Sequence, residues 1–122
     1  MKINLGIASL IGALTIVLGA FGAHALEDTL TADGLKSFET AVRYQMYHVF
    51  ALTFAGWALK QHQSRRFEQA GWFFVAGVAL FSGSLYIMTF TGLKWLGAIT
   101  PLGGLAFLAG WLSLIIGFWK LK

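Results

Sequence analysis

The sequence has no cysteine and very few charged residues. Without cysteine the chain forms no disulfide bond, zinc–thiolate site or iron–sulfur cluster, and it has no thiol nucleophile and no lipoprotein anchor. Charged residues make up only 11% of its 122 residues, against about 25% in an ordinary soluble domain. Hydrophobic residues make up 57%, an excess that has to face lipid. The composition therefore predicts a small integral membrane protein with a single domain, residues 1–122.

Stretches without formal charge predict four membrane spans. Residues 3–26 form one such stretch, and as a helix they reach about 36 Å, more than the roughly 30 Å of a hydrocarbon core. Residues 69–93 and 95–119 are two more. Residues 44–59 reach only about 24 Å, so they span the membrane only if Arg43 lies at its boundary with its side chain extended outward. We predict an all-α, integral membrane four-helix bundle with approximate spans at 3–26, 41–59, 70–91 and 95–119.

The flanking residues refine these helices. Glu39 precedes Arg43 by four residues, a favourable spacing for an ion pair, so the second helix is expected to begin before the membrane does, with Thr31 as its N-cap. Pro101 is expected to start or bend the last helix. The first stretch also fits a cleaved signal peptide, with Ala23-His24-Ala25 as the cleavage site, but it exceeds the roughly 7 to 15 apolar residues of such a peptide. A retained first span is therefore favoured.

The positively charged residues predict the orientation, because Lys and Arg accumulate on the cytoplasmic side. Six lie on one side of the predicted spans, namely Lys2, Lys60, Arg65, Arg66, Lys120 and Lys122, and three lie on the other, namely Lys36, Arg43 and Lys94. This distribution places both termini in the cytoplasm (N-in/C-in) and the acidic first loop outside. Three tryptophans then form an inner aromatic belt (Trp57, Trp72 and Trp119), with Trp95 at the outer edge.

Small residues recur on one face of each span at alternating intervals of three and four, as expected where helices pack closely in lipid. These seams are Ala8, Gly12, Thr15, Gly19 and Gly22; Ala41, Tyr44, His48, Ala51, Ala55 and Ala58; Ala76, Ala79, Gly83 and Tyr86; and Gly103, Ala106, Gly110, Ser113 and Gly117. The second seam places Tyr44 and His48 on the inward face of its helix.

Polar side chains gather in the outer half of the predicted bundle. They include Tyr47, Ser82 and Thr89, and the candidate site residues among them are His24, Tyr44, Gln45, His48, Ser84, Tyr86 and Thr100. Because ionisable groups inside a membrane are costly, they mark candidate functional sites, and the candidate partners of His48 are Tyr44, Ser84, Tyr86 and Thr100. The same residues also suit plain hydrogen bonding between helices. A ligand pocket and a packing role both stay open.

Three functions follow from these residues. The first is a non-enzymatic protein whose outward-facing polar pocket binds a lipid or another small molecule, with no catalytic residue, metal or cofactor. The alternatives are a purely structural or accessory protein, and a small transporter or channel subunit, for which neither an inverted repeat nor a broken helix pair is evident.

His24 and His48 differ in depth, which disfavours a haem between them. The expected partners are membrane lipids, with a homo-oligomer or a membrane-protein partner as alternatives, and the basic loop around Arg65 suits anionic lipid and no nucleic acid.

Several short motifs together resemble one family. They are GAFGAHAL (residues 19–26), YQMYH (44–48), LFSGSLY (80–86), ITPLGG (99–104) and Gly110-Trp111. The set resembles the YgdD-like family of small bacterial inner-membrane proteins of unknown function, and the resemblance covers nearly the whole chain. It implies a four-span protein of the inner or plasma membrane and brings no established substrate or catalytic residue.

Overall fold

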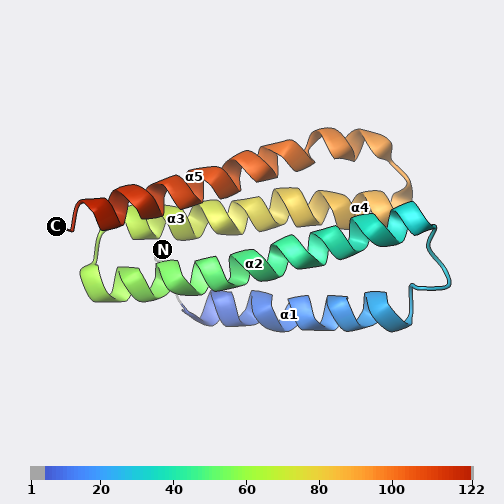
Figure 1. Ribbon diagram of the computed structural model, residues 1–122, viewed down its shortest axis with the longest axis horizontal. Coiled ribbons are helices and arrows are strands. Elements are labelled where there is room, and N and C mark those ends of the chain that lie inside the picture. Colours follow the sequence, from blue (N-terminus) through green and yellow to red (C-terminus); the bar gives the residue numbers. More distant parts are fainter. Residues whose placement is uncertain (1–4, 122) are drawn as a thin grey trace.

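The computed structural model describes residues 5–121, which are helical throughout apart from short connections (Figure 1). The elements are α1 (Leu5–His24), α2 (Ala32–His62), α3 (Arg65–Gly77), the π-helical turn η1 (Val78–Ser82), α4 (Gly83–Thr91), the 3-10 turn η2 (Lys94–Ala98) and α5 (Thr100–Trp119). Since α3, η1 and α4 follow one another without a break, they form one rod. The prediction of an all-α protein is confirmed. Residues 3 and 4 of the first predicted span, Lys2 and Lys122 lie outside the described residues.

Four helical rods lie side by side, each antiparallel to the next, in the order α1, α2, α3–α4 and α5 (Figure 1). α1 packs against α2, α2 packs against α3 and α4, and α5 packs against α3. α1 begins and α5 ends beside the turn between α2 and α3, at residues 62–65, which we call the turn end (Figure 1). The connections at residues 25–31 and 92–99 lie at the opposite end, which we call the loop end.

Three of the rods are long and apolar enough to cross a membrane, namely Leu5–His24, Arg65–Thr91 and Lys94–Trp119. α2 is longer, with 31 residues, but carries charged residues toward both of its ends. The coarse prediction of a helical membrane protein therefore agrees with the structure.

Local signals account for where these helices begin and end. Thr31 is the N-cap of α2, as predicted, because its hydroxyl accepts a hydrogen bond from the Gly34 N–H at 3.1 Å. Gln63 closes the same helix in the left-handed conformation, with its N–H bonded to the Leu59 carbonyl. Pro101 lies in the first turn of α5, where its missing N–H leaves no hydrogen bond unmade, so its predicted role at the helix start is confirmed.

The predicted small-residue seams of α1 and α5 are packing faces. In α1, Ala8, Thr15 and Gly22 are buried, and the other two seam residues are partly buried. In α5, Gly103, Gly110 and Gly117 are buried and lie against three phenylalanines of the neighbouring rod, Phe81, Phe74 and Phe67. Glycine on one rod thus makes room for an aromatic ring or the backbone of the other.

The predicted seam of the third span is wrong, because Ala76 and Ala79 are exposed. The buried face of α3 consists of Phe67, Ala70, Gly71, Phe74 and Gly77. Large rings fill the gaps that the α5 glycines leave, so the contact face of α3 is not its row of small residues. After Gly77, η1 takes up an extra residue and changes which side chains face inward.

Two predictions about α2 are also wrong. Tyr44 is 38% exposed, whereas the rest of its predicted seam, including His48, is buried. η1 approaches α2 closely at Ala41, whose carbonyl accepts a hydrogen bond from Ser82, so the Tyr44 ring packs at the edge of the contact against Phe81. Glu39 and Arg43 form no ion pair with each other or with any other residue in the described range.

Candidate functional site

His48 lies near the middle of α2 with both ring nitrogens hydrogen-bonded. Its Nδ1 lies 2.8 Å from the carbonyl oxygen of Tyr44, and the indole Nε1 of Trp111 lies 3.3 Å from its Nε2. A carbonyl only accepts and an indole N–H only donates, so Nδ1 must carry the proton and Nε2 must be unprotonated. His48 is therefore a neutral imidazole with no free nitrogen, only 5% exposed.

Aromatic rings from two other helices enclose His48. The Phe107 ring of α5 stacks on the imidazole, with centroids 3.5 Å apart and planes 6° from parallel. Phe74 of α3 lies at 5.6 Å and Trp111 of α5 at 6.3 Å. Together these rings join α2, α3 and α5 at one point.

Neither Phe107 nor Trp111 was among the predicted partners of His48. A signal was present at Trp111, because this tryptophan lies inside a predicted span and belongs to neither aromatic belt. An indole N–H at membrane depth finds no water and needs an acceptor within the protein. The sequence offers several acceptors, and only the packing of α5 against α3 selects His48.

Two further pairs of predicted residues are brought together. The hydroxyl of Tyr86 donates to Oε1 of Gln45 at 2.6 Å and joins α4 to α2. The hydroxyls of Ser84 and Thr100 lie 2.6 Å apart and join α4 to the start of α5. Ser84 has one hydroxyl proton and donates it to the Phe81 carbonyl at 2.9 Å, so Thr100 is the donor to Ser84.

Ser82 belonged to the predicted polar cluster but not to the seven candidate site residues, and it makes a contact of the same kind. It is fully buried in η1, and its hydroxyl donates to the Ala41 carbonyl of α2 at 2.7 Å. Sequence periodicity gave no signal for this contact, since a regular α-helix through residues 78–82 would present a different side chain to α2.

The remaining two predicted residues lie apart from these pairs. His24 is exposed at the end of α1 and makes no hydrogen bond or ring contact within residues 5–121. Tyr44 contributes its backbone carbonyl to His48, while its ring contacts Phe81 and Tyr47. The seven predicted residues are thus divided among separate contacts.

Surface grooves lie at other places. One is on α3 near the turn end, one is between α2 and α5, and two adjoining grooves are between α1 and α2. None of the seven predicted site residues lines any of these four grooves. In the described part of the chain, no group of three or more His, Asp or Glu residues is placed to hold a metal ion.

An all-helical layer with three rods of membrane-crossing length and apolar side chains over its outer surface defines an integral membrane protein of several helices. Residues 18–104 match the family described as "Protein of unknown function (DUF423)", and the chain belongs to this family. The predicted resemblance to YgdD-like proteins is confirmed.

Relatives match along almost the full chain. A UPF0382 membrane protein of Staphylococcus haemolyticus is 45% identical over 120 residues, which is 98% of each chain. The UPF0382 membrane protein YwdK of Bacillus subtilis is 41% identical and covers 95% of each chain. The UPF0382 inner membrane protein YgdD of Escherichia coli is 36% identical over 94% of this chain and 88% of YgdD. The predicted location in the inner membrane is confirmed, and no solved structure matches the chain.

Proposed function

We propose that this protein is a non-enzymatic, four-span protein of the inner membrane that serves as a structural or accessory unit, and that its polar side chains hold its helices together. The observation that carries the proposal is the pairing of both ring nitrogens of His48, with Tyr44 and with Trp111. An imidazole held in this way has no nitrogen left for a substrate, a proton relay or a haem iron.

The other polar pairs support the same role. Gln45 with Tyr86, Ser84 with Thr100, and Ser82 with the Ala41 carbonyl each join two different elements. Hydrogen bonds between membrane helices contribute only about 0.6 kcal/mol each on average. Their main effect is therefore to add to the rotation and register that the glycine–phenylalanine contacts between the rods already select.

The length and position of α2 support a fourth span. Its 31 residues reach about 46 Å, which exceeds the roughly 30 Å of a hydrocarbon core. α2 lies between α1 and α3, and both neighbours belong to rods that are apolar enough to cross (Figure 1). Arg43 and Lys60 bound its charge-free stretch, so both charges reach the two interfaces when the stretch crosses.

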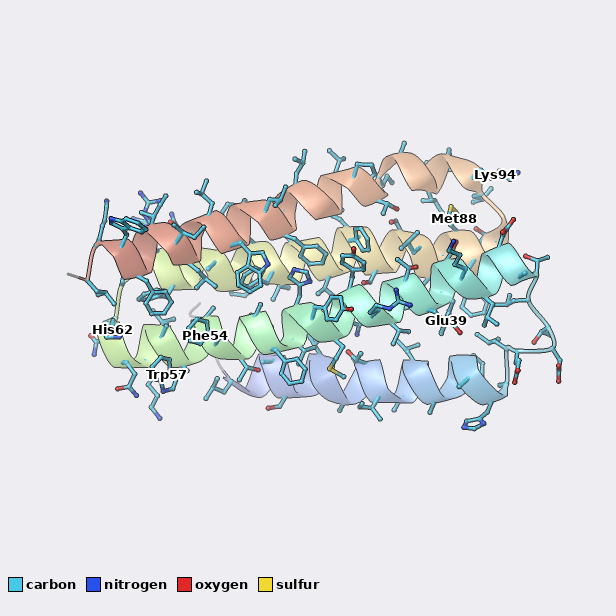
Figure 2. All side chains as sticks on the ribbon, viewed as in Figure 1. Glu39, Phe54, Trp57, His62, Met88 and Lys94 are labelled. Carbon is cyan, nitrogen blue, oxygen red and sulfur yellow. The ribbon has the colours of Figure 1, made fainter. Side chains whose placement is uncertain are left out.

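The two ends of the molecule differ in charge, and this supports the N-in/C-in orientation. The turn end carries Lys60, Arg65, Arg66 and Lys120, whereas the loop between α1 and α2 carries Glu27 and Asp28. Trp57 lies toward the turn end beside His62, in the region expected for the inner aromatic belt (Figure 2).

Reporter fusions test this orientation. A reporter that is active only in the cytoplasm should be active when fused after Lys122 and inactive when inserted near Asp33, in the loop between α1 and α2. A reporter that is active only outside should give the reverse. The physical reason is the accumulation of Lys and Arg on the cytoplasmic side. Equal cytoplasmic activity at both positions would contradict the fourth span, and activity only outside at Lys122 would reverse the orientation.

Substitution of His48 tests the structural role. His48→Ala should lower the melting temperature of the purified protein, because it removes the stack with Phe107 and leaves the Trp111 N–H without its acceptor. His24→Ala is the matched control and should leave the melting temperature unchanged, since His24 is exposed and unpaired in the described structure.

Native mass spectrometry of the same variants separates the structural role from a ligand pocket. We expect wild type and His48→Ala to carry the same bound species. A small molecule that copurifies with wild type and is lost from a folded His48→Ala variant would contradict the proposal and restore the ligand pocket.

A further inference from the structure

Two adjoining grooves lie between α1 and α2 toward the loop end. The first has a volume of about 260 Å³ and is lined by Gly19, Gly22, Ala23, Phe38, Glu39, Val42 and Arg43. The second has a volume of about 240 Å³, and its lining residues are Gly22, Ala23, Glu27, Leu35 and Glu39. The two share three residues and form one continuous depression, which we call the α1–α2 groove.

The α1 wall of this groove is low because its residues are small. Gly19 and Gly22 have no side chain, and Ala23 has only a methyl group. On α2 the opposite wall is formed by Val42, next to the buried ring of Phe38, with two charged residues beside it. The result is an apolar trough with charged groups along one side.

Arg43 lines the groove and has no protein partner in the described part of the chain. It makes no ion pair or hydrogen bond within the described residues, although Glu39 lies one helical turn away. It directly precedes the charge-free stretch of α2, so it lies where the hydrocarbon core begins. An arginine at that depth is costly unless an anion or water neutralises it.

The charged groups along the groove follow a definite order. Arg43 is deepest, Glu39 lies about 6 Å farther out along α2, and Glu27 lies beyond the end of α1. Figure 2 shows Glu39 at the side of α2 that faces α1. From the membrane outward, the groove therefore presents one cation and then two anions.

We propose that the α1–α2 groove binds the head group of a phospholipid that carries both a phosphate and a primary ammonium, the phosphatidylethanolamine class. In such a lipid the phosphate lies next to the acyl chains and the ammonium lies farther out on a short linker. The phosphate then pairs with Arg43 and the ammonium with Glu39 and Glu27, while an acyl chain lies along Val42 and Gly19. Charge-assisted hydrogen bonds of this kind are stronger than neutral ones.

The same order of charges disfavours a purely anionic head group. Such a lipid would also find Arg43, but its outer part would meet two carboxylates with no positive charge to offer them. The groove thus distinguishes lipids by the group that their head group carries farther out than the phosphate, and it favours an ammonium there. The assignment of the groove to the outer leaflet rests on the proposed orientation, and the depth of Arg43, on which the choice of head group depends, rests on the proposed crossing of α2.

Native mass spectrometry of the delipidated protein in detergent tests the inference. Phosphatidylethanolamine and phosphatidylglycerol with identical acyl chains are titrated separately, and we expect the first to bind about tenfold more tightly. Arg43→Gln should weaken phosphatidylethanolamine binding about tenfold, the effect of losing one charged pair. Glu39→Gln should reduce the preference between the two lipids severalfold, because the ammonium loses a partner and an anionic head group loses a repulsion.

Lys36→Gln is the matched control, since Lys36 is an exposed cation on the same helix that lines neither groove. It should bind both lipids as wild type does. Equal binding of the two lipids by wild type, or undiminished phosphatidylethanolamine binding by Arg43→Gln, would overturn the inference. If Arg43→Gln does not fold, the lipid preference of Glu39→Gln decides, and an unchanged preference overturns it.

This measurement is independent of membrane sidedness, so its result is distinct from that of the reporter fusions. If the reporter fusions show the opposite orientation, the groove lies in the other leaflet and the lipid preference is unchanged. A failed lipid preference would leave the helix contacts around His48 as they are.

Discussion

Replacing Gly103 by alanine is expected to destabilise the protein by about 3 kcal/mol, the upper end for overpacking a tight contact. A Cβ at this position would overlap the backbone of Phe81, with the Phe81 Cα only 2.7 Å away. Because the obstacle is backbone in η1, no change of rotamer relieves it, and α5 would have to move away from the neighbouring rod. Unfolding of the purified protein in detergent, followed by circular dichroism, measures the effect.

The adjacent Gly104 provides a matched control in the same turn of α5. A Cβ there would meet nothing within 4 Å, so Gly104→Ala should be neutral or stabilise the helix by up to about 1 kcal/mol. Trimming the ring with Phe81→Ala should not rescue Gly103→Ala, because the clash is with main-chain atoms. Similar melting temperatures for the two glycine variants would mean that α5 does not approach η1 as closely as the structure shows.

Gly110→Leu is expected to lower the free energy of unfolding by about 3 kcal/mol or more, as overpacking does. The obstacle differs from the one at Gly103. Here an added Cβ would lie 2.5 Å from Cε1 and 2.7 Å from Cδ1 of the Phe74 ring. The obstacle is a side chain, so a smaller residue at position 74 should relieve it. The double variant Gly110→Leu with Phe74→Ala is therefore expected to lose less unfolding free energy than the two single variants lose together. The difference, which is the coupling energy, should be about 1 kcal/mol or more.

The double-mutant cycle of Gly103→Ala with Phe81→Ala should show no such coupling energy. Measuring both cycles by the same unfolding method separates side-chain contacts between α3 and α5 from backbone contacts. Strict additivity in the Gly110 cycle would show that the Phe74 ring does not occupy the gap that Gly110 leaves.

Features encoded by neighbouring residues could be predicted without the structure. The charge-free stretches marked the rods, Thr31 marked the start of α2, and Pro101 marked the start of α5. The periodic glycines of α1 and α5 marked their contact faces. Each of these signals acts within a few residues along the chain, through helix geometry, capping or the absence of a side chain.

The contacts of the polar residues depended on packing between distant segments. Whether His48 meets Trp111, Ser84 or Tyr86 depends on how far α5 is rotated against α3, and the fit of Phe74 and Phe107 over Gly110 and Gly77 decides that rotation. The extra residue in η1 then shifts the inward face of the third rod, which places Ser82 against Ala41.

The sequence by itself thus determined a helical membrane protein and the packing faces of its first and last helices, because helix periodicity and hydropathy are local properties. Only the tertiary structure decided the face of α3, the exposed position of Tyr44 and the partners of His48, and only it opened the groove beside Arg43. The physical reason is that a hydrogen bond or a groove between two helices requires both surfaces at once, and large residues on one helix and small ones on the other set their registration together.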